Sequence, residues 1–340
     1  MLAIHTKTGP FAAGWVAYCL EKGIPFKEVD CFSPNIVEEV SDCKALLWHW
    51  SHNDFAATIF ARQLIASVQA MGLVVFPSIE TCWHFDDKVG QKYLLEAVHA
   101  PFIPTSVFYD PSTALDWLKT AKMPLVWKLR GGAGSRNVHL VKTKRRARKI
   151  IQKSFQSGWH TSRLFTLSEK LRLARAKPSV KNIAGIMRGI GRVIVPHQAY
   201  RYQLPEKGYV YFQDYIPDNY YDIRIIVIGQ RAFGIKRMVR DGDFRASGSG
   251  KIIYDKNQIP KQCIELAFET ASQISSQSCA FDFVQIGGTW KIVELSYGFS
   301  LQGYLLCPGY WRSDLSWVPG KFRPEEFIIR DLLEECDYNT

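Results

Sequence analysis

The alternation of apolar and polar positions predicts short strands and amphipathic helices in the first 84 residues. Four apolar runs have strand-like composition, and two longer stretches repeat apolar residues at helical spacing. The predicted strands are Leu2–Thr6, Phe26–Cys31, Ala45–Trp50 and Leu73–Phe76, and the predicted helices are Phe11–Lys22 and Asp54–Met71. Strands that alternate with helices form parallel sheets. The sequence therefore predicts a small α/β lobe here.

The remaining residues continue this mixture of strands and helices. A helical pattern over Val89–Ala97 ends before Pro101 and Pro104, since proline disfavours a continuing helix. Further strands are predicted at Thr105–Tyr109, Pro124–Leu129, Tyr209–Gln213, Asp222–Ile228 and Ala232–Met238. Another helix is predicted over Gln262–Gln273, and the aromatic tail beyond residue 300 is expected to be irregular.

The stretch Ala280–Ser296 predicts a β-hairpin, because two β-branched and aromatic runs flank a pair of glycines. A three-residue loop, Gly287–Thr289, would place Asp282 opposite Glu294 on one face. A two-residue loop would put these acids on opposite faces and mix polar with apolar pairs. The hydrophobic pattern therefore favours the three-residue loop.

Two opposed carboxylates suggest a bound cation. Directly opposed side chains have Cβ atoms about 5 Å apart, where like charges repel. Mg²⁺ binds carboxylates together with phosphate oxygens, so Asp282 and Glu294 suggest a metal–nucleotide site. The alternative is a solvated strand end whose charges are spread by water.

Two glycine-containing turns are candidate anion sites. Lys128 lies in an apolar strand and is followed by Arg130–Ser135, where backbone amides can close around phosphate. The lysine could instead extend to solvent from an edge strand. Gly9–Gly14 lies between the first strand and helix, where N–H groups could hold an anion or form a plain turn.

Composition and charge indicate a globular protein with one basic segment. The 340 residues are 47% hydrophobic, enough for a sizeable core in two or three lobes. No signal peptide and no apolar run near the length of a membrane span are visible, so a cytoplasmic location is expected. Residues 142–207 hold 17 Lys and Arg against two acids, which gives this segment +15 and the rest −4.

The basic segment has three interpretations. Its first part, KTKRRARKII, predicts a solvent-facing helix, and its second part alternates basic with apolar residues. Such a surface could rest on anionic lipid, or could be a solvated face or a lid. Nucleic acid is a weaker interpretation, because few aromatic residues are available to stack on bases.

The cysteines and histidines do not predict a metal site. The eight cysteines are scattered without a C-x-x-C pair, so reduced and mostly buried thiols are expected. His49 and His52 are predicted on one strand, where their three-residue offset would point them to opposite faces. Both are interpreted as structural.

The order of motifs from about Asp87 to Gly303 resembles the ATP-grasp superfamily, specifically its RimK-type branch of carboxylate–amine ligases. The motifs are DDKVGQKYLLEA, PLVWKLRGGAGSRNVHLV, YFQDYIPDNYYDIRIIVIG, IKRMVRDGDFRAS and DFVQIGGTWKIVELS. This resemblance implies an α/β (α+β) fold with an N-terminal parallel lobe, residues 1–84. Two α+β lobes would then sandwich the nucleotide: residues 85–213, with the basic insertion at about 142–207, and residues 214–340.

The resemblance also implies roles for single residues. Lys88 and Lys128 would hold the α and β phosphates, Asp222 would approach the ribose, and Arg237, with Lys128, would act at the transferred phosphate. The implied phosphate flap consists of Gly131, Gly132, Gly134 and Ser135, and the implied adenine hinge of Gln213, Asp214, Tyr215 and Ile216. The implied Mg²⁺ ligands are Asp282, Glu294 and Ser296. The family usually has asparagine where Ser296 and Ser247 stand, so both positions depart from its pattern.

The implied activity is ATP-dependent ligation of a carboxylate to an amine through an acyl phosphate, with ATP and Mg²⁺ required. The expected acceptors are a peptide or a carboxylated surface-polysaccharide precursor at the inner membrane face, contacted through residues 142–207. The alternatives are a kinase that phosphorylates a hydroxyl, a non-catalytic nucleotide-binding module and a polyanion-binding protein.

Overall fold

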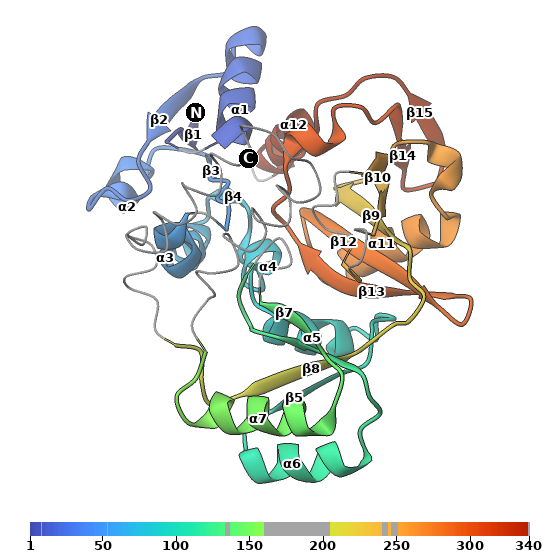
Figure 1. Ribbon diagram of the computed structural model, residues 1–340. Coiled ribbons are helices and arrows are strands. Elements are labelled where there is room, and N and C mark those ends of the chain that lie inside the picture. Colours follow the sequence, from blue (N-terminus) through green and yellow to red (C-terminus); the bar gives the residue numbers. More distant parts are fainter. Residues whose placement is uncertain are drawn as a thin grey trace, which may run out of the picture. The chain divides into compact units, whose positions relative to one another are not determined.

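The computed structural model describes residues 1–7, 9–52, 54–132, 137–159, 205–239, 244–245 and 251–338 (Figure 1). The chain divides into two compact units: Met1–Ile103 together with Ile216–Thr340, and Pro104–Tyr215. Gly134, Ser135, Ser247 and the alternating part of the basic segment lie outside the described residues. The three-part division predicted from the sequence stays a prediction.

A parallel sheet and its helices form the N-terminal part of the first unit. The elements are β1 (Leu2–His5), α1 (Gly9–Lys22), β2 (Phe26–Val29), α2 (Ile36–Glu39), β3 (Ala45–Leu47), α3 (Phe55–Ala70), β4 (Val74–Phe76) and α4 (Ile79–Cys82). The strand order is β2-β1-β3-β4, with every neighbouring pair parallel. The predicted α/β lobe is confirmed.

The third strand is shorter than predicted, which corrects the placement of two histidines. β3 ends at Leu47, so His49 and His52 lie beyond it and not on a strand. The backbone of Trp50 bonds instead to a distant side chain: its N–H donates to the Tyr297 hydroxyl, which donates to the Trp50 carbonyl. Side-chain hydrogen bonds thus replace the strand ladder here.

An antiparallel sheet forms the rest of the first unit. Its strands are β9 (Tyr221–Ile228), β10 (Arg231–Met238), β11 (Ile252–Ile253), β12 (Ser278–Ile286), β13 (Thr289–Ser296), β14 (Gly309–Arg312) and β15 (Trp317–Pro319). They follow the order β13-β12-β9-β10-β14-β15, with β11 on β10. The helices are α5 (Lys88–Ala97), η1 (Lys256–Gln258), α11 (Lys261–Gln273), η2 (Leu301–Tyr304) and α12 (Pro324–Tyr338). The aromatic tail is therefore more regular than predicted.

The second unit is a smaller sheet covered by two helices. Its elements are β5 (Thr105–Phe108), α6 (Pro111–Thr120), β6 (Leu125–Lys128), β7 (Val138–Val141), α7 (Lys144–Phe155) and β8 (Val210–Asp214). The strand order is β5-β8-β6-β7, and all pairs are antiparallel. The apolar face of α7 packs into this core through Ala147, Ile150 and Ile151, while its basic residues are exposed, as predicted.

Two further observations bear on the composition analysis. All eight cysteines are free and buried, as predicted. Among the described residues, no helix combines the length and the hydrophobicity that crossing a membrane requires.

Candidate functional site

The hairpin β12–β13 places Asp282 opposite Glu294, but not through the predicted loop. Ile286 pairs with Thr289 across a two-residue loop, in which Gly287 and Gly288 have φ of 54° and 84°. Both values lie in the left-handed region that a tight hairpin turn requires. The three-residue loop predicted from the hydrophobic pattern is therefore wrong.

A β-bulge restores the pair of acids. Phe283 pairs with Ile292, whereas Asp282 pairs with Glu294, so β13 has one extra residue, Val293, between these two rungs. The extra residue keeps Phe283 and Ile292 in the apolar core and turns the two carboxylates to the other face. The register at Asp282 was predicted correctly, although the turn was not.

Asp282 is the centre of a network of four charged side chains on three neighbouring strands. Arg224 of β9 donates to it from Nε at 2.5 Å and from Nη2 at 2.6 Å. Arg237 of β10 approaches it at 2.9 Å and also donates two hydrogen bonds of 2.6 Å to Asp222. The strand register explains this network, because Asp282 lies opposite Arg224, and Asp222 opposite Arg237.

The network fixes Asp282 as a carboxylate. Burial by itself opposes ionisation, but the charges of Arg224 and Arg237 outweigh it and hold the pKa of Asp282 well below its usual range. Sequence reasoning missed Arg224. Its position two residues after Asp222 places both side chains on one face of β9, and this signal could have identified it.

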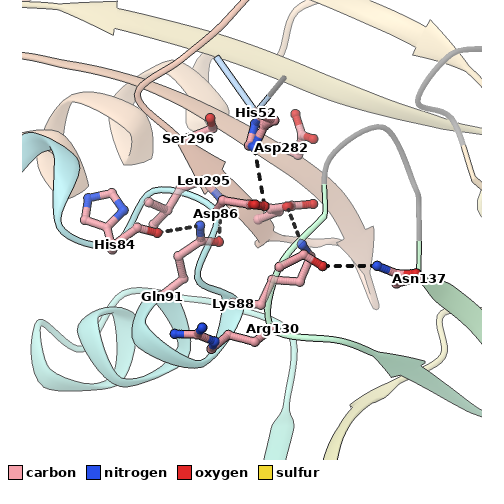
Figure 2. Close-up of polar contacts among 12 residues, drawn as sticks. His52, His84, Asp86, Lys88, Gln91, Arg130, Asn137, Asp282, Leu295 and Ser296 are labelled. Carbon is pink, nitrogen blue, oxygen red and sulfur yellow. Dashed lines mark hydrogen bonds and ion pairs between the residues drawn. The ribbon is translucent and has the colours of Figure 1, made fainter. Parts of the chain in front are cut away.

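Lys88 approaches the second acid of the hairpin. It is the first residue of α5, which Asp87 caps by accepting from Gly90 N at 2.9 Å. Its side chain is 4% exposed, and its Nζ lies 3.3 Å from Glu294 Oε1, a contact marked at Lys88 in Figure 2. Lys88 and Glu294 thus form an ion pair that is buried at the lysine and more open at the acid.

Gln91 fixes the start of α5 against β13. Its amide donates to the His84 carbonyl at 3.1 Å, and its carbonyl oxygen accepts from Leu295 N at 3.4 Å (Figure 2). Leu295 follows Glu294 directly in the chain. The ion pair of Lys88 is therefore supported by a buried amide that joins the same helix to the same strand.

His52 and Asp86 form a neighbouring pair that the sequence did not indicate. His52 Nδ1 lies 3.3 Å from Asp86 Oδ1, and the imidazole ring packs on Phe85 with the ring centroids 4.3 Å apart (Figure 2). Asp86 has φ of 55°, a left-handed conformation that is uncommon for non-glycine residues. The segment from Asp86 to Lys88 therefore presents three charged side chains in succession.

Asp282, Glu294 and Ser296 fit Mg²⁺ as an open site. The Ser296 hydroxyl donates to the Gly298 carbonyl at 2.9 Å, which leaves its oxygen lone pairs available. Asp282 Oδ2 lies near both Arg224 and Arg237, whereas Oδ1 accepts from Arg224 Nε, so Oδ1 is the oxygen that keeps a lone pair for a metal ion. Among the described residues, no group of three or more His, Cys, Asp or Glu could hold a metal ion by itself. Two carboxylates and one hydroxyl are oxygen donors, which suit an ion that completes its shell with phosphate and water.

The second unit carries the other predicted residues. Lys128 is 4% exposed at the end of β6, and Gly131 and Gly132 follow it, with φ of 116° at Gly132. The Asn137 side chain, labelled in Figure 2, donates to the Gly131 carbonyl at 3.4 Å. Gly131, at the base of the predicted flap, is therefore held by a side-chain hydrogen bond.

The predicted hinge follows β8. Gln213 is buried and donates from Nε2 to Thr105 Oγ1 at 3.2 Å, and the Asp214 N–H donates to the Pro104 carbonyl at 3.0 Å. Burial raises the pKa of Asp214. The second unit ends at Tyr215 and the first resumes at Ile216, so the predicted hinge coincides with a boundary between the units.

The structure thus gathers one group of predicted residues in each unit. The first unit holds Lys88, Ile216, Asp222, Arg237, Asp282, Glu294 and Ser296. The second unit holds Lys128, Gly131, Gly132, Gln213, Asp214 and Tyr215. The assignments of these residues to nucleotide and metal remain predictions.

Comparison with known proteins identifies the fold. Residues 169–304 match the model of the RimK-like ATP-grasp domain. No curated protein matches the sequence. The RimK-like resemblance derived from the motifs is confirmed by the domain match and by a RimK-domain protein among the similar structures.

Three solved structures illustrate the similarity. A RimK-domain ATP-grasp protein from Sphaerobacter thermophilus has a TM-score of 0.57 at 16% identity, covering 98% of this chain and 99% of that one. A β,γ-ATP complex of biotin carboxylase from Campylobacter jejuni has a TM-score of 0.58 at 14% identity. The match covers 96% of this chain and 70% of that one. D-alanine–D-alanine ligase from Bacillus anthracis has a TM-score of 0.55 at 11% identity, and the match covers 100% of this chain and 99% of that one. The chain therefore has the ATP-grasp fold.

Proposed function

We propose that this chain, which has the ATP-grasp fold and a RimK-like domain, is an ATP-dependent carboxylate–amine ligase. It would activate a substrate carboxylate as an acyl phosphate and transfer the acyl group to an amine. The similarity to D-alanine–D-alanine ligase supports ligation, and the biotin carboxylase complex with β,γ-ATP supports use of a nucleotide. ATP and Mg²⁺ are the proposed cofactors.

One observation carries this proposal. Asp282 and Glu294 lie directly opposite each other, and each contacts a buried cation, Arg237 at 2.9 Å and Lys88 at 3.3 Å. Phosphoryl transfer requires positioning and charge neutralisation more than covalent protein groups. Paired acids beside paired cations provide both, since the acids suit a metal ion and the cations suit phosphate.

The residues would divide the reaction between them. A substrate carboxylate oxygen attacks the γ-phosphorus, the bond to the β-γ bridging oxygen breaks, and ADP leaves. Arg237 and Lys128 would neutralise charge on the transferred phosphoryl group, while Lys88 would hold the nucleotide phosphates. Mg²⁺, held by Asp282, Glu294 and Ser296, would supply charge neutralisation at the β and γ phosphates.

The second half of the reaction forms the amide. The amine nitrogen attacks the acyl carbon, the carbon–oxygen bond to phosphate breaks, and the amine proton leaves to solvent or a nearby base. The products are an amide, ADP and inorganic phosphate. The hinge at Gln213–Ile216 would pair with the adenine edge, and Asp222 would approach the ribose from the first unit.

The acceptor is proposed to be a peptide or a carboxylated surface-polysaccharide precursor. The exposed face of α7 supports an anionic partner, because it carries six basic side chains and no acidic one. These residues are Lys144, Arg145, Arg146, Arg148, Lys149 and Lys153. A protein in the cytoplasm, peripheral to the inner membrane face, would meet such a precursor at an anionic surface.

Product analysis tests the reaction class. The purified protein is incubated with ATP, Mg²⁺ and pooled carboxylates and amines, and ADP and phosphate are measured separately. A ligase releases both in equal amounts, and Glu294→Gln abolishes the release. ADP without free phosphate would identify a kinase, and ATP binding without turnover in any mixture would identify a non-catalytic module.

A further inference from the structure

The glycine-rich turn after β6 already holds an anion that comes from the chain itself. The Arg130 N–H donates to Glu206 Oε2 at 3.0 Å, and the Gly131 N–H donates to Glu206 Oε1 at 3.4 Å. Successive backbone N–H groups that converge in this way form an anion-binding concavity. The carboxylate of Glu206 therefore lies where an oxyanion would bind.

A tyrosine completes the set of donors. The Tyr209 hydroxyl donates to Glu206 Oε2 and accepts from the Arg130 N–H at 2.6 Å. Burial and then the charge of Glu206 raise the pKa of Tyr209, so its hydroxyl stays protonated and able to donate. Arg130 is exposed, and Gly131, Glu206 and Tyr209 are only partly buried, so solvent and ligands can reach these donors.

The backbone of Glu206 is anchored, whereas the hydrogen bonds of its side chain within the described part of the chain are those with these donors. Its N–H donates to the Trp159 carbonyl at 2.8 Å, and its carbonyl accepts from Trp159 N–H at 2.9 Å. A rotation of the Glu206 side chain would therefore release these three donors without moving the backbone. Glu206 is also one of only two acids among residues 142–207, which hold 17 basic residues.

We propose that Arg130 N–H, Gly131 N–H and Tyr209 hydroxyl form a seat for one phosphate group, and that Glu206 is an internal competitor which leaves when phosphate binds. The ligand class is a polyphosphate, and the identification of that ligand as ATP rests on the proposed function. Glu206 thereby lowers the apparent affinity for phosphate and satisfies the N–H groups of Arg130 and Gly131 when none is bound.

Removal of the competing charge tests the proposal. Glu206→Gln keeps the size of the side chain. Asp116→Asn is the matched control, because it also removes one negative charge from the second unit, where Asp116 forms an exposed ion pair with Lys119. Binding of inorganic tripolyphosphate and of Mg-ATP is measured by titration calorimetry. Glu206→Gln is expected to bind tripolyphosphate about five- to tenfold more tightly than the wild type, since a neutral amide oxygen competes less strongly for the N–H groups than a carboxylate and does not repel the phosphate. Asp116→Asn is expected to change affinity by less than about twofold, because exposed charges are screened.

A measurement on the wild type removes the dependence on the variant's folding. Carbodiimide labelling of Glu206, followed by mass spectrometry, is expected to be faster with tripolyphosphate than without, since displacement exposes the carboxylate. Equal labelling rates, or a Glu206→Gln affinity no tighter than that of Asp116→Asn, would overturn the proposal. If the tripolyphosphate effects appear but Mg-ATP does not bind, the seat stands and the ligase assignment fails. If neither tripolyphosphate effect appears and Mg-ATP binds equally to wild type and Glu206→Gln, the seat fails and the ligase assignment stands.

Discussion

Asp282 and Glu294 face each other because β13 carries one more residue than β12 at this point. The two-residue turn alone would pair Asp282 with Val293 and direct Glu294 toward the apolar side with Phe281. The bulge at Val293 shifts the register by one and places both acids on the same face. The arrangement of the two acids therefore depends on a turn and a bulge together.

The first prediction concerns this turn. Gly288 has φ of 84° and open space around its Cβ position, so Gly288→Val is expected to destabilise the protein by about 1–2 kcal/mol through backbone strain alone. Gly287→Asn is the control, because asparagine tolerates the left-handed conformation of a two-residue turn. Unfolding in urea measures both. Equal stabilities of the two variants would contradict the two-residue loop.

The local elements were predictable from the sequence, because burial leaves a pattern of apolar residues in each. The parallel strands β1, β3 and β4 are short continuous apolar runs, since both faces are buried, and α3 shows apolar residues at helical spacing. The bulge at Val293 was not predictable, since a hydrophobic pattern shows which residues are buried but not where one strand contains an extra residue. The helix α12 had such a signal, in the spacing of Phe327, Ile328 and Leu332, but the aromatic residues before it obscured it.

The candidate site was predictable only in part, for a similar reason. Asp282 and Glu294 were found because the hairpin is local in sequence. Arg224 was missed because its partner lies 58 residues away, and a cross-strand ion pair depends on which strands become neighbours. His52 was interpreted as a structural residue on a strand, but β3 ends at Leu47, before it. The contact of His52 with Asp86 arises from the packing of two loops and has no local pattern.

The second prediction concerns Arg224. Arg224→Gln is expected to cost about 2–4 kcal/mol of unfolding free energy, because Asp282 would lose one of two guanidinium partners while its side chain is only 11% exposed. Arg231→Gln is the control. This substitution breaks the ion pair between Arg231 and Asp331, which are 2.6 Å apart in the same unit. The Asp331 side chain is 31% exposed, so the loss of unfolding free energy is expected to be about 1 kcal/mol.

A double-mutant cycle with Asp282→Asn separates the pair from other effects of Arg224. The coupling energy between positions 224 and 282 is expected to be about 2 kcal/mol or more, within the range for groups of one network. Chemical denaturation of the wild type, both single variants and the double variant gives this value. Additive effects of the two substitutions would show that Arg224 does not hold Asp282.

The third prediction concerns Lys88. Lys88→Met is expected to weaken Mg-ATP binding by about tenfold or more, because the proposed site would lose a buried cation beside Glu294. Lys92→Met is the matched control, since Lys92 lies on the same helix and pairs at 2.5 Å with Glu96, not with an acid of the hairpin. Titration calorimetry measures both. Equal affinities of the two variants would remove Lys88 from the nucleotide site.

The fourth prediction concerns acid stability. Burial lowers the pKa of His49 to about 3 and, together with the charge of Arg62, that of His84 to about 4. Below the unfolded-state value near 6.5 the unfolded chain takes up protons that the folded protein does not. Stability is therefore complete above this pH and falls as the pH decreases, by about 1.4 kcal/mol per pH unit for each histidine.

Substitution of one of these histidines tests the assignment. Both nitrogens of His84 are buried and have no hydrogen-bond partner among the described residues, so His84→Leu removes a titrating group without breaking a described hydrogen bond. The decrease of unfolding free energy between pH 6.5 and 5 is expected to become smaller by about 1.4 kcal/mol per pH unit. His139→Asn, at an exposed position, should leave the slope unchanged. A His84→Leu variant with the wild-type slope would show that His84 becomes protonated in the folded protein, and would place the acid sensitivity elsewhere.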